Sequence, residues 1–104
     1  MLAKKYRLNR KKIGLIHKRG RRFNFGKIGM KCLPNNLGYS RFAVNVPVSV
    51  YKKAVDRNRL RRIIYDEAGK SVLAQKSYDC LIGLFAPLTD EKNEIQKVFK
   101  QITI

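Results

Sequence analysis

The most constraining feature of this chain is an arginine-rich segment, residues 54–64, that also carries an apolar stripe. Leu60, Ile63 and Ile64 recur at the spacing of one helix face, which predicts a helix packed on a sheet. Its arginines then point outward as a fork of guanidinium groups, which suits bidentate binding of phosphates; they are Arg57, Arg59, Arg61 and Arg62. The alternative is a solvated helix face, but such faces normally mix charge signs, and only Asp56 opposes these arginines.

The positive charge of the chain is large and confined to one part of it. The net charge is +17 over 104 residues, while 44% hydrophobic residues suffice for a small core, so we expect a single domain over residues 1–104. Residues 1–62 hold 19 Lys and Arg against one acid, and residues 63–104 hold 5 against 6 acids. This imbalance predicts a polyanionic partner, with nucleic acid favoured over an anionic membrane surface because no long basic amphipathic helix with bulky aromatics is present.

Cysteine usage and the N-terminus bear on the compartment. Cys32 and Cys80 lie within apolar alternation and are predicted to be buried thiols in a reducing environment; a disulfide is the alternative. No apolar run is long enough to span a membrane. The basic start resembles a mitochondrial transit peptide, but it runs directly into a segment with folded character, so we predict a cytoplasmic protein.

Periodicity and turn residues predict the order of elements. These are a helix over 10–19 capped by Asn9 and ended by Gly20, an extended segment over 21–25, strands over 27–33 and 41–46, the arginine helix over about 53–68 ended by Gly69, an apolar strand over 78–86, and a last helix capped by Thr89. The result is an α+β sandwich in which helices pack on a small mixed sheet.

The sequence carries a binding signature but no convincing catalytic one. Its acids form no metal-binding carboxylate cluster, and it contains no phosphate-binding glycine loop or nucleophile elbow. The one histidine, His17, has no carboxylate near it in sequence. We therefore predict no catalytic residue and no metal site, and a structural or RNA-contacting role for His17.

The aromatic residues divide into two predicted groups. One group is interleaved with basic residues and is open to either base stacking or core packing: Phe23, Phe25 and Tyr39. The other group is predicted to lie in the core: Phe42, Phe85 and Phe99.

In these segments the chain resembles the protein subunit of bacterial ribonuclease P. The strongest match is Ala54-Val55 followed by Arg57-Asn58-Arg59-Leu60-Arg61-Arg62, against that family's Ala-Val-x-Arg-Asn-Arg-(Ile/Leu)-(Lys/Arg)-Arg. Further matches are a helix ending in Lys18-Arg19-Gly20-Arg21-Arg22-Phe23, the strand 42–46, and the apolar strand after Tyr78-Asp79 with a Thr-initiated last helix. The resemblance covers nearly the whole chain in order.

The resemblance implies a two-layer sandwich of order α-β-β-β-α-β-α with a left-handed β-α-β crossover. It implies an RNA-binding subunit of an endoribonuclease whose RNA partner holds the Mg²⁺ ions and removes the 5′ leader of precursor tRNA; the protein alone needs no cofactor, protein partner or membrane. Contacts to ribonuclease P RNA are implied for Lys52, Lys53, Arg57, Asn58, Arg59, Arg61 and Arg62. A cleft for the single-stranded leader is implied for Arg10, Ile13, His17, Lys27, Lys31 and Arg41.

This chain departs from the family pattern in the implied cleft. Ile13 and His17 stand where the family often has phenylalanines, Lys31 stands for an aromatic, and Pro47-Val48-Ser49 replaces Ser-Lys-Lys. A less aromatic cleft would draw more of its affinity from phosphate contacts. The alternative function is that of a small basic ribosomal or other rRNA-binding structural protein, which would share the charge, size and fold type; a stand-alone nuclease would need a carboxylate cluster.

Overall fold

The computed structural model of the chain describes residues 4–102, apart from the side chain of Arg10. The elements, in chain order, are η1 (Lys4–Tyr6), α1 (Arg10–Arg19), β1 (Arg21–Asn24), β2 (Ile28–Pro34), β3 (Arg41–Asn45), α2 (Ala54–Lys70), η2 (Val72–Gln75), β4 (Tyr78–Leu84) and α3 (Glu91–Gln101), where η denotes a short 3-10 helix. The predicted α-β-β-β-α-β-α order is therefore confirmed.

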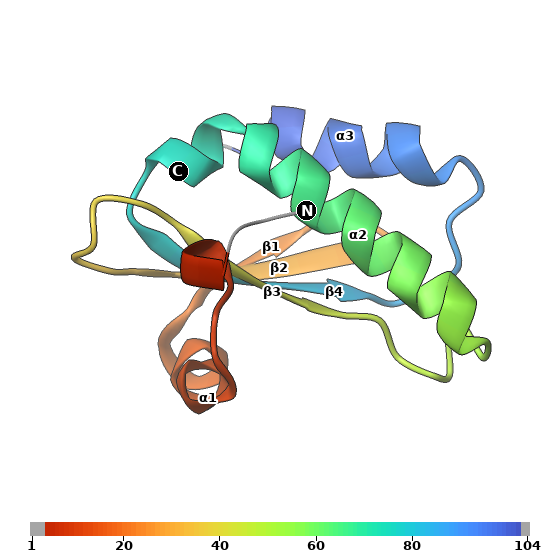
Figure 1. Cartoon of the computed structure of the whole chain (residues 1–104), viewed down its shortest axis with the longest axis horizontal. Helices are drawn as coiled ribbons and strands as arrows, with labels where there is room; N and C mark the ends of the chain where they lie inside the picture. The colour runs from red at the N-terminus through yellow and green to blue at the C-terminus, as the bar shows by residue number, and fades with distance from the viewer. Residues whose placement is uncertain (1–3, 103–104) are drawn as a thin grey trace.

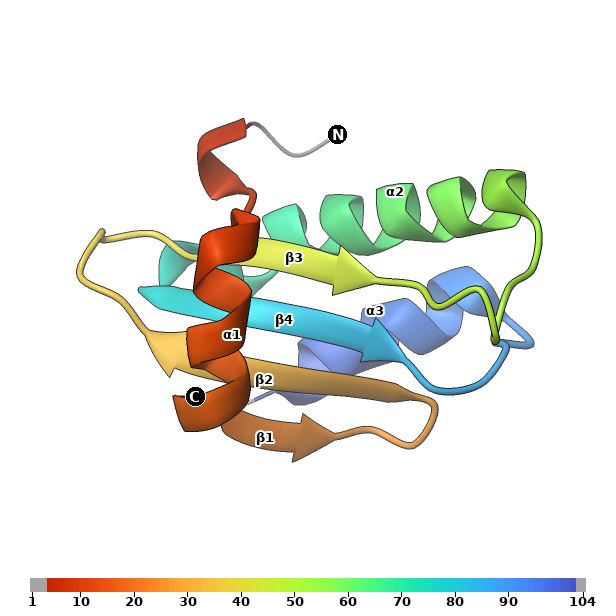
Figure 2. The ribbon, with the colours of Figure 1, turned by 90° about the horizontal axis from the view of Figure 1, so that it is seen from below.

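The four strands form one mixed sheet in the order β1-β2-β4-β3. β2 pairs antiparallel with both β1 and β4, whereas β3 and β4 run parallel. A parallel pair needs a crossover connection, and α2 supplies it. With β3 and β4 pointing to the right in Figure 2, α2 lies behind the sheet and β4 lies below β3, so the crossover is left-handed.

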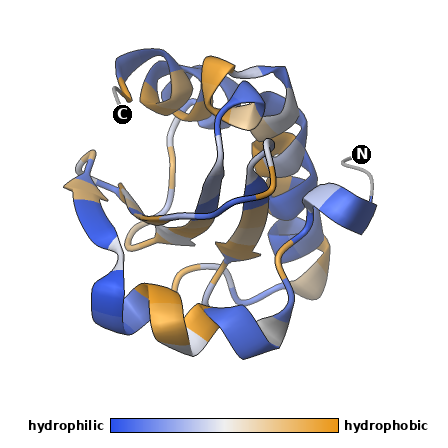
Figure 3. Cartoon of the chain, turned by 90° about the vertical axis from the view of Figure 1, so that its left-hand side faces the viewer, coloured by the Kyte–Doolittle hydropathy of each residue, from blue (hydrophilic) through white to orange (hydrophobic). Residues whose placement is uncertain are grey.

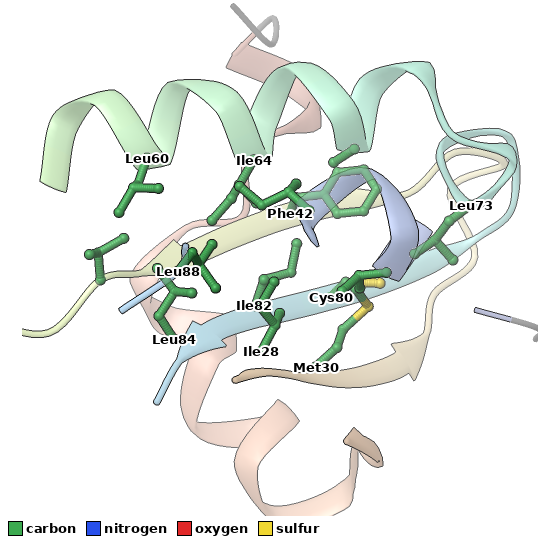
Figure 4. Close-up of a cluster of buried hydrophobic side chains, with 14 of the residues drawn as sticks. Ile28, Met30, Phe42, Leu60, Ile64, Leu73, Cys80, Ile82, Leu84 and Leu88 are labelled. Carbon is green, nitrogen blue, oxygen red and sulfur yellow. The ribbon is translucent and has the colours of Figure 1, made fainter. Parts of the chain in front are cut away.

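Helices cover both faces of this sheet, α2 and α3 on one and α1 on the other (Figure 1), so the α+β fold has three layers and not the two that the resemblance implies. The main core lies under α2 and α3. There Ile28, Met30 and Cys32 of β2 are all buried, which confirms the predicted alternation, and Phe42 is fully buried against them (Figure 4). Each fully buried side chain of this size contributes about 1.5–3 kcal/mol, so this layer is the main source of stability.

The α1 layer is thinner. Ile16 is fully buried against Ala43 of β3 and Leu8, with Ile13, Leu33 and Leu81 packed around them. Figure 3 shows the apolar middle of α1 between hydrophilic ends. Because α1 touches the sheet through so short an apolar stripe, part of this sheet face stays uncovered, and the site described below lies there.

The cysteines are neighbours across two strands. Cys32 and Cys80 are register partners in β2 and β4, both are free and buried, and their sulfur atoms lie 3.1 Å apart. The prediction of buried thiols is confirmed. The hydrogen bond with Cys32, together with burial, raises the pKa of the Cys80 thiol.

Several predicted boundaries are wrong, and for two of them the structure shows a local reason. α2 continues through Gly69 to Lys70 and ends where the Ser71 hydroxyl donates to the carbonyl of Ala68 (2.6 Å). The last helix begins after Asp90, not Thr89, because the Glu94 carboxylate accepts the N–H groups of Thr89 and Asp90 (2.8 and 2.9 Å). The apolar strand ends at Leu84. None of the helices within residues 4–102 combines the length and apolar character that crossing a membrane requires.

Candidate RNA interface

A cleft of about 720 Å³ lies beside α1 on the sheet face that α1 leaves partly uncovered. Figure 2 shows α1 crossing the strands and leaving the carboxyl ends of β3 and β4 open. Of the residues that the sequence assigns to a cleft, the structure brings three together here: Ile13, His17 and Lys31. The basic side chains of Arg22, from β1, and Arg61, from α2, also line this cleft.

Lys31 joins the sheet to the last turn of α1. Its ammonium donates to the backbone carbonyl of His17 (3.4 Å) and lies 3.5 Å from the Nδ1 atom of the same residue. A cation at the carboxyl end of a helix is favoured by the helix dipole. Lys31, which stands where the family has an aromatic residue, therefore also holds α1 over the cleft.

Two predicted cleft residues lie elsewhere. Lys27 pairs with Glu94 (3.4 Å) at the start of α3 and does not line the cleft, so its assignment to the cleft is not supported. Arg41 donates two hydrogen bonds to Asp79 (2.9 and 2.8 Å) with its side chain only 19% exposed. Arg10 begins α1, and its side chain lies outside what the structure describes.

Phe85 is the cleft residue that sequence reasoning missed. It was predicted to lie in the core, but its side chain is 58% exposed and lines the cleft, whereas Phe42 is fully buried and Phe99 packs on the core. The signal was present in the alternation of β4. Cys80, Ile82 and Leu84 face the core, so the odd-numbered position 85 belongs on the opposite face.

The arginines of α2 have different surroundings. Arg57 donates to the carbonyls of Tyr51 and Lys52 (3.0 and 2.8 Å) and fixes the loop before the helix. Arg61 bonds Asn58 (2.9 Å) and reaches the cleft. Arg62 is exposed, as are Lys52, Lys53 and Asn58, so this side of α2 presents the basic surface that the sequence predicts.

Arg59 is the centre of an ion-pair network that the sequence did not reveal. Its guanidinium donates to Glu91 of α3 (3.1 and 3.0 Å) and to Asp56 (2.7 Å). These hydrogen bonds, with Glu91 first and Asp56 second, raise the pKa of Arg59 above its ordinary value. Arg59 therefore ties α2 to the start of α3 and is less available to a phosphate than Arg62.

Three of the other acidic side chains are similarly engaged. Asp79 pairs with Arg41, Glu94 with Lys27, and Glu67 accepts a hydrogen bond from Gln96 (2.9 Å). Among residues 4–102, no three His, Cys, Asp or Glu side chains are grouped so as to hold a metal ion.

With this geometry in place, comparison with known proteins identifies the family. The family model described as Ribonuclease P matches residues 2–103. The chain belongs to this family. A comparison with curated protein sequences gives no match.

Solved structures from this family share the fold. An RNase P protein from Staphylococcus aureus superposes with a TM-score of 0.77 at 20% identity, covering 93% of this chain and 91% of that one. The RNase P protein from Thermotoga maritima, in complex with 1-(4-fluorophenyl)-2-thiourea, gives 0.72 at 19% identity, covering 90% and 96%. The interpretation as a ribonuclease P protein is thus confirmed. Membership of this family implies association with ribonuclease P RNA and a part in tRNA processing. No comparison favours a ribosomal protein.

Proposed function

We propose that this protein binds ribonuclease P RNA through the exposed basic side of α2 and holds the single-stranded 5′ leader of precursor tRNA in the cleft beside α1. The RNA then carries out the cleavage with Mg²⁺ that it binds itself. The observation that carries this proposal is the convergence of Arg22, Lys31 and Arg61 on one cleft in a family member whose net charge is +17. Such a groove suits a single RNA strand, whose phosphates it can follow.

The free, buried thiols of Cys32 and Cys80 favour a reducing compartment, and we place the protein in the cytoplasm on that basis.

The test of leader binding uses the reconstituted holoenzyme. Precursor tRNA with a leader of several nucleotides should bind more tightly than a matched tRNA without a leader. If three phosphates contact Arg22, Lys31 and Arg61, the leader-dependent part of log K should fall with log salt with a slope of about −2. Equal affinity of the two RNAs at every salt concentration would show that the cleft does not hold the leader.

Lys31→Gln and Lys27→Gln form a matched pair for this test. Lys31 lines the cleft, so its substitution should weaken leader binding and make the slope shallower by about 0.7. Lys27 pairs with Glu94 outside the cleft, so its substitution should leave leader binding unchanged. Titration of both precursor tRNAs against each holoenzyme measures the difference. A larger loss for Lys27→Gln would contradict the assignment.

Arg62→Ala and Arg59→Ala separate RNA contact from fold support. Arg62 is exposed, so its loss should weaken binding of ribonuclease P RNA by about 1.5–3 kcal/mol, the range for a hydrogen bond to a charged group, with an unchanged Tm. Loss of Arg59 should lower the Tm because Glu91 and Asp56 lose their partner. RNA titration measures the affinity and thermal unfolding measures the Tm of each variant. If Arg59→Ala weakened RNA binding at an unchanged Tm and Arg62→Ala lowered the Tm, Arg59 would be the RNA contact.

A further inference from the structure

The floor of the cleft contains a row almost without side chains. Gly29 of β2 is the register partner of Gly83 of β4, and Gly83 is the partner of Asn45 of β3. A Cβ atom placed on Gly83 would meet nothing within 4 Å. The backbone of the sheet is therefore open to the cleft at Gly83, and a flat ring can approach it closely there.

Phe85 borders this floor. A Cβ atom placed on Gly29 would lie 2.5 and 2.7 Å from the Cε2 and Cζ atoms of the Phe85 ring, so the ring occupies the space that a side chain at position 29 would fill. The N–H of Phe85 donates to the carbonyl of Lys27 (2.8 Å), which fixes its backbone to the sheet. The ring is nevertheless 58% exposed. An exposed aromatic ring held in a fixed place is the usual platform for stacking a nucleobase.

The groups around the ring fit the rest of a nucleotide. Asn45 is exposed at the far end of the glycine row, and an amide side chain offers both a donor and an acceptor to the edge of a base. The cations of Arg22, Lys31 and Arg61 line the same cleft and suit the phosphates on either side. A flat floor, a stacking ring, a polar edge and a cationic rim together favour one unpaired nucleotide over an apolar ligand or a peptide.

We propose that one base of the bound RNA strand stacks on Phe85, whose ring covers Gly29, and lies over the open floor at Gly83, with Asn45 at the edge of the base. This inference rests on the proposed function, since the strand is the leader of precursor tRNA. It adds a phenylalanine ring for stacking in a cleft whose α1 side offers Ile13 and His17 instead of phenylalanines.

Two variants test the platform from opposite directions. Phe85→Leu removes the aromatic face from an exposed position, so the fold should survive. Gly83→Val adds a side chain to the floor, where its Cβ atom meets nothing within 4 Å, and valine favours strands, so the fold should survive while the base is blocked. Gly14→Ala is the matched control, because Gly14 is exposed on α1, outside the cleft, and its added Cβ also meets nothing within 4 Å. Thermal unfolding checks each fold.

The readout is the affinity of each holoenzyme for precursor tRNA without a leader, with an intact leader, and with leaders in which one base at a time is replaced by an abasic sugar. In the wild type, one abasic position should weaken binding at least about fivefold. Phe85→Leu and Gly83→Val should weaken binding of the intact leader by a similar factor and become insensitive to that abasic position, whereas Gly14→Ala should match the wild type.

The outcomes separate the two proposals. If the leader increases the affinity of the wild type, but both cleft variants bind precursor tRNA with an intact leader as tightly as the wild type does, the stacking proposal is overturned and leader binding stands. The stacking proposal is also overturned, with leader binding intact, if the wild type responds to no abasic position. If the wild type gains nothing from the leader, the proposed function fails and the stacking proposal fails with it.

Discussion

Protein freed of nucleic acid should leave precursor tRNA intact at every Mg²⁺ concentration, and addition of ribonuclease P RNA should restore cleavage to a mature 5′ end. The physical reason lies in how the carboxylates are used. Asp79, Glu91 and Glu94 are paired with Arg41, Arg59 and Lys27, so these side chains serve the fold. We therefore expect the protein to contribute positive charge, which would lower the repulsion between two RNA molecules and reduce the Mg²⁺ concentration at which the RNA is active.

The measurement is cleavage of end-labelled precursor tRNA over a Mg²⁺ titration with protein alone, RNA alone and both together. The control is protein carrying Arg62→Ala, which should need more RNA or less salt for the same rate but should also be inactive alone. Metal-dependent cleavage by protein alone that persists through nuclease treatment and repurification would contradict this prediction and show that the protein itself catalyses the cleavage.

Periodicity was enough to predict which side chains of β2 and of the arginine helix are buried. The alternation of Ile28, Met30 and Cys32 and the arginine helix with Leu60 and Ile64 buried both follow from side-chain direction, a property of neighbouring residues. The same argument would have placed Phe85 in the cleft, because successive residues of a strand face opposite sides of the sheet and Leu84 faces the core. There the apolar character of the side chain was wrongly given more weight than its direction.

Long-range pairs could not be predicted from local pattern. Glu91 is 32 positions from Arg59, and Asp79 is 38 positions from Arg41. Nothing in the spacing of basic residues indicates which of them meets a carboxylate once α3 and β4 are in place. The candidate RNA contacts therefore needed the structure to separate Arg62, which is exposed, from Arg59, which is paired.

Arg41→Met is expected to destabilise the fold by about 3 kcal/mol, near the lower end for removal of one partner from a buried ion pair. Asp79 is 5% exposed, and its two oxygens accept both hydrogen bonds from Arg41. The hydrogen bond from Asn35 (2.8 Å) and the charge of Lys12 would then remain to stabilise the buried carboxylate. The measurement is denaturant unfolding at pH 7. The double variant Arg41→Met with Asp79→Leu should recover most of the loss because no charge stays buried.

The pH dependence of Arg41→Met distinguishes this pair from an ordinary surface contact. Burial alone would raise the pKa of Asp79, but hydrogen bonds from Arg41 and Asn35 outweigh it and hold the pKa below its ordinary value. In the wild type this carboxylate therefore stabilises the fold above pH about 4, and the stabilisation is lost as pH falls through the lowered pKa. Without Arg41, burial should raise the pKa of Asp79 above the unfolded value, so protonation relieves the variant. The difference in unfolding free energy between variant and wild type should narrow as pH falls from about 7 towards 4. A difference that stays constant over this range would mean that Arg41 acts through packing and not through the charge of Asp79.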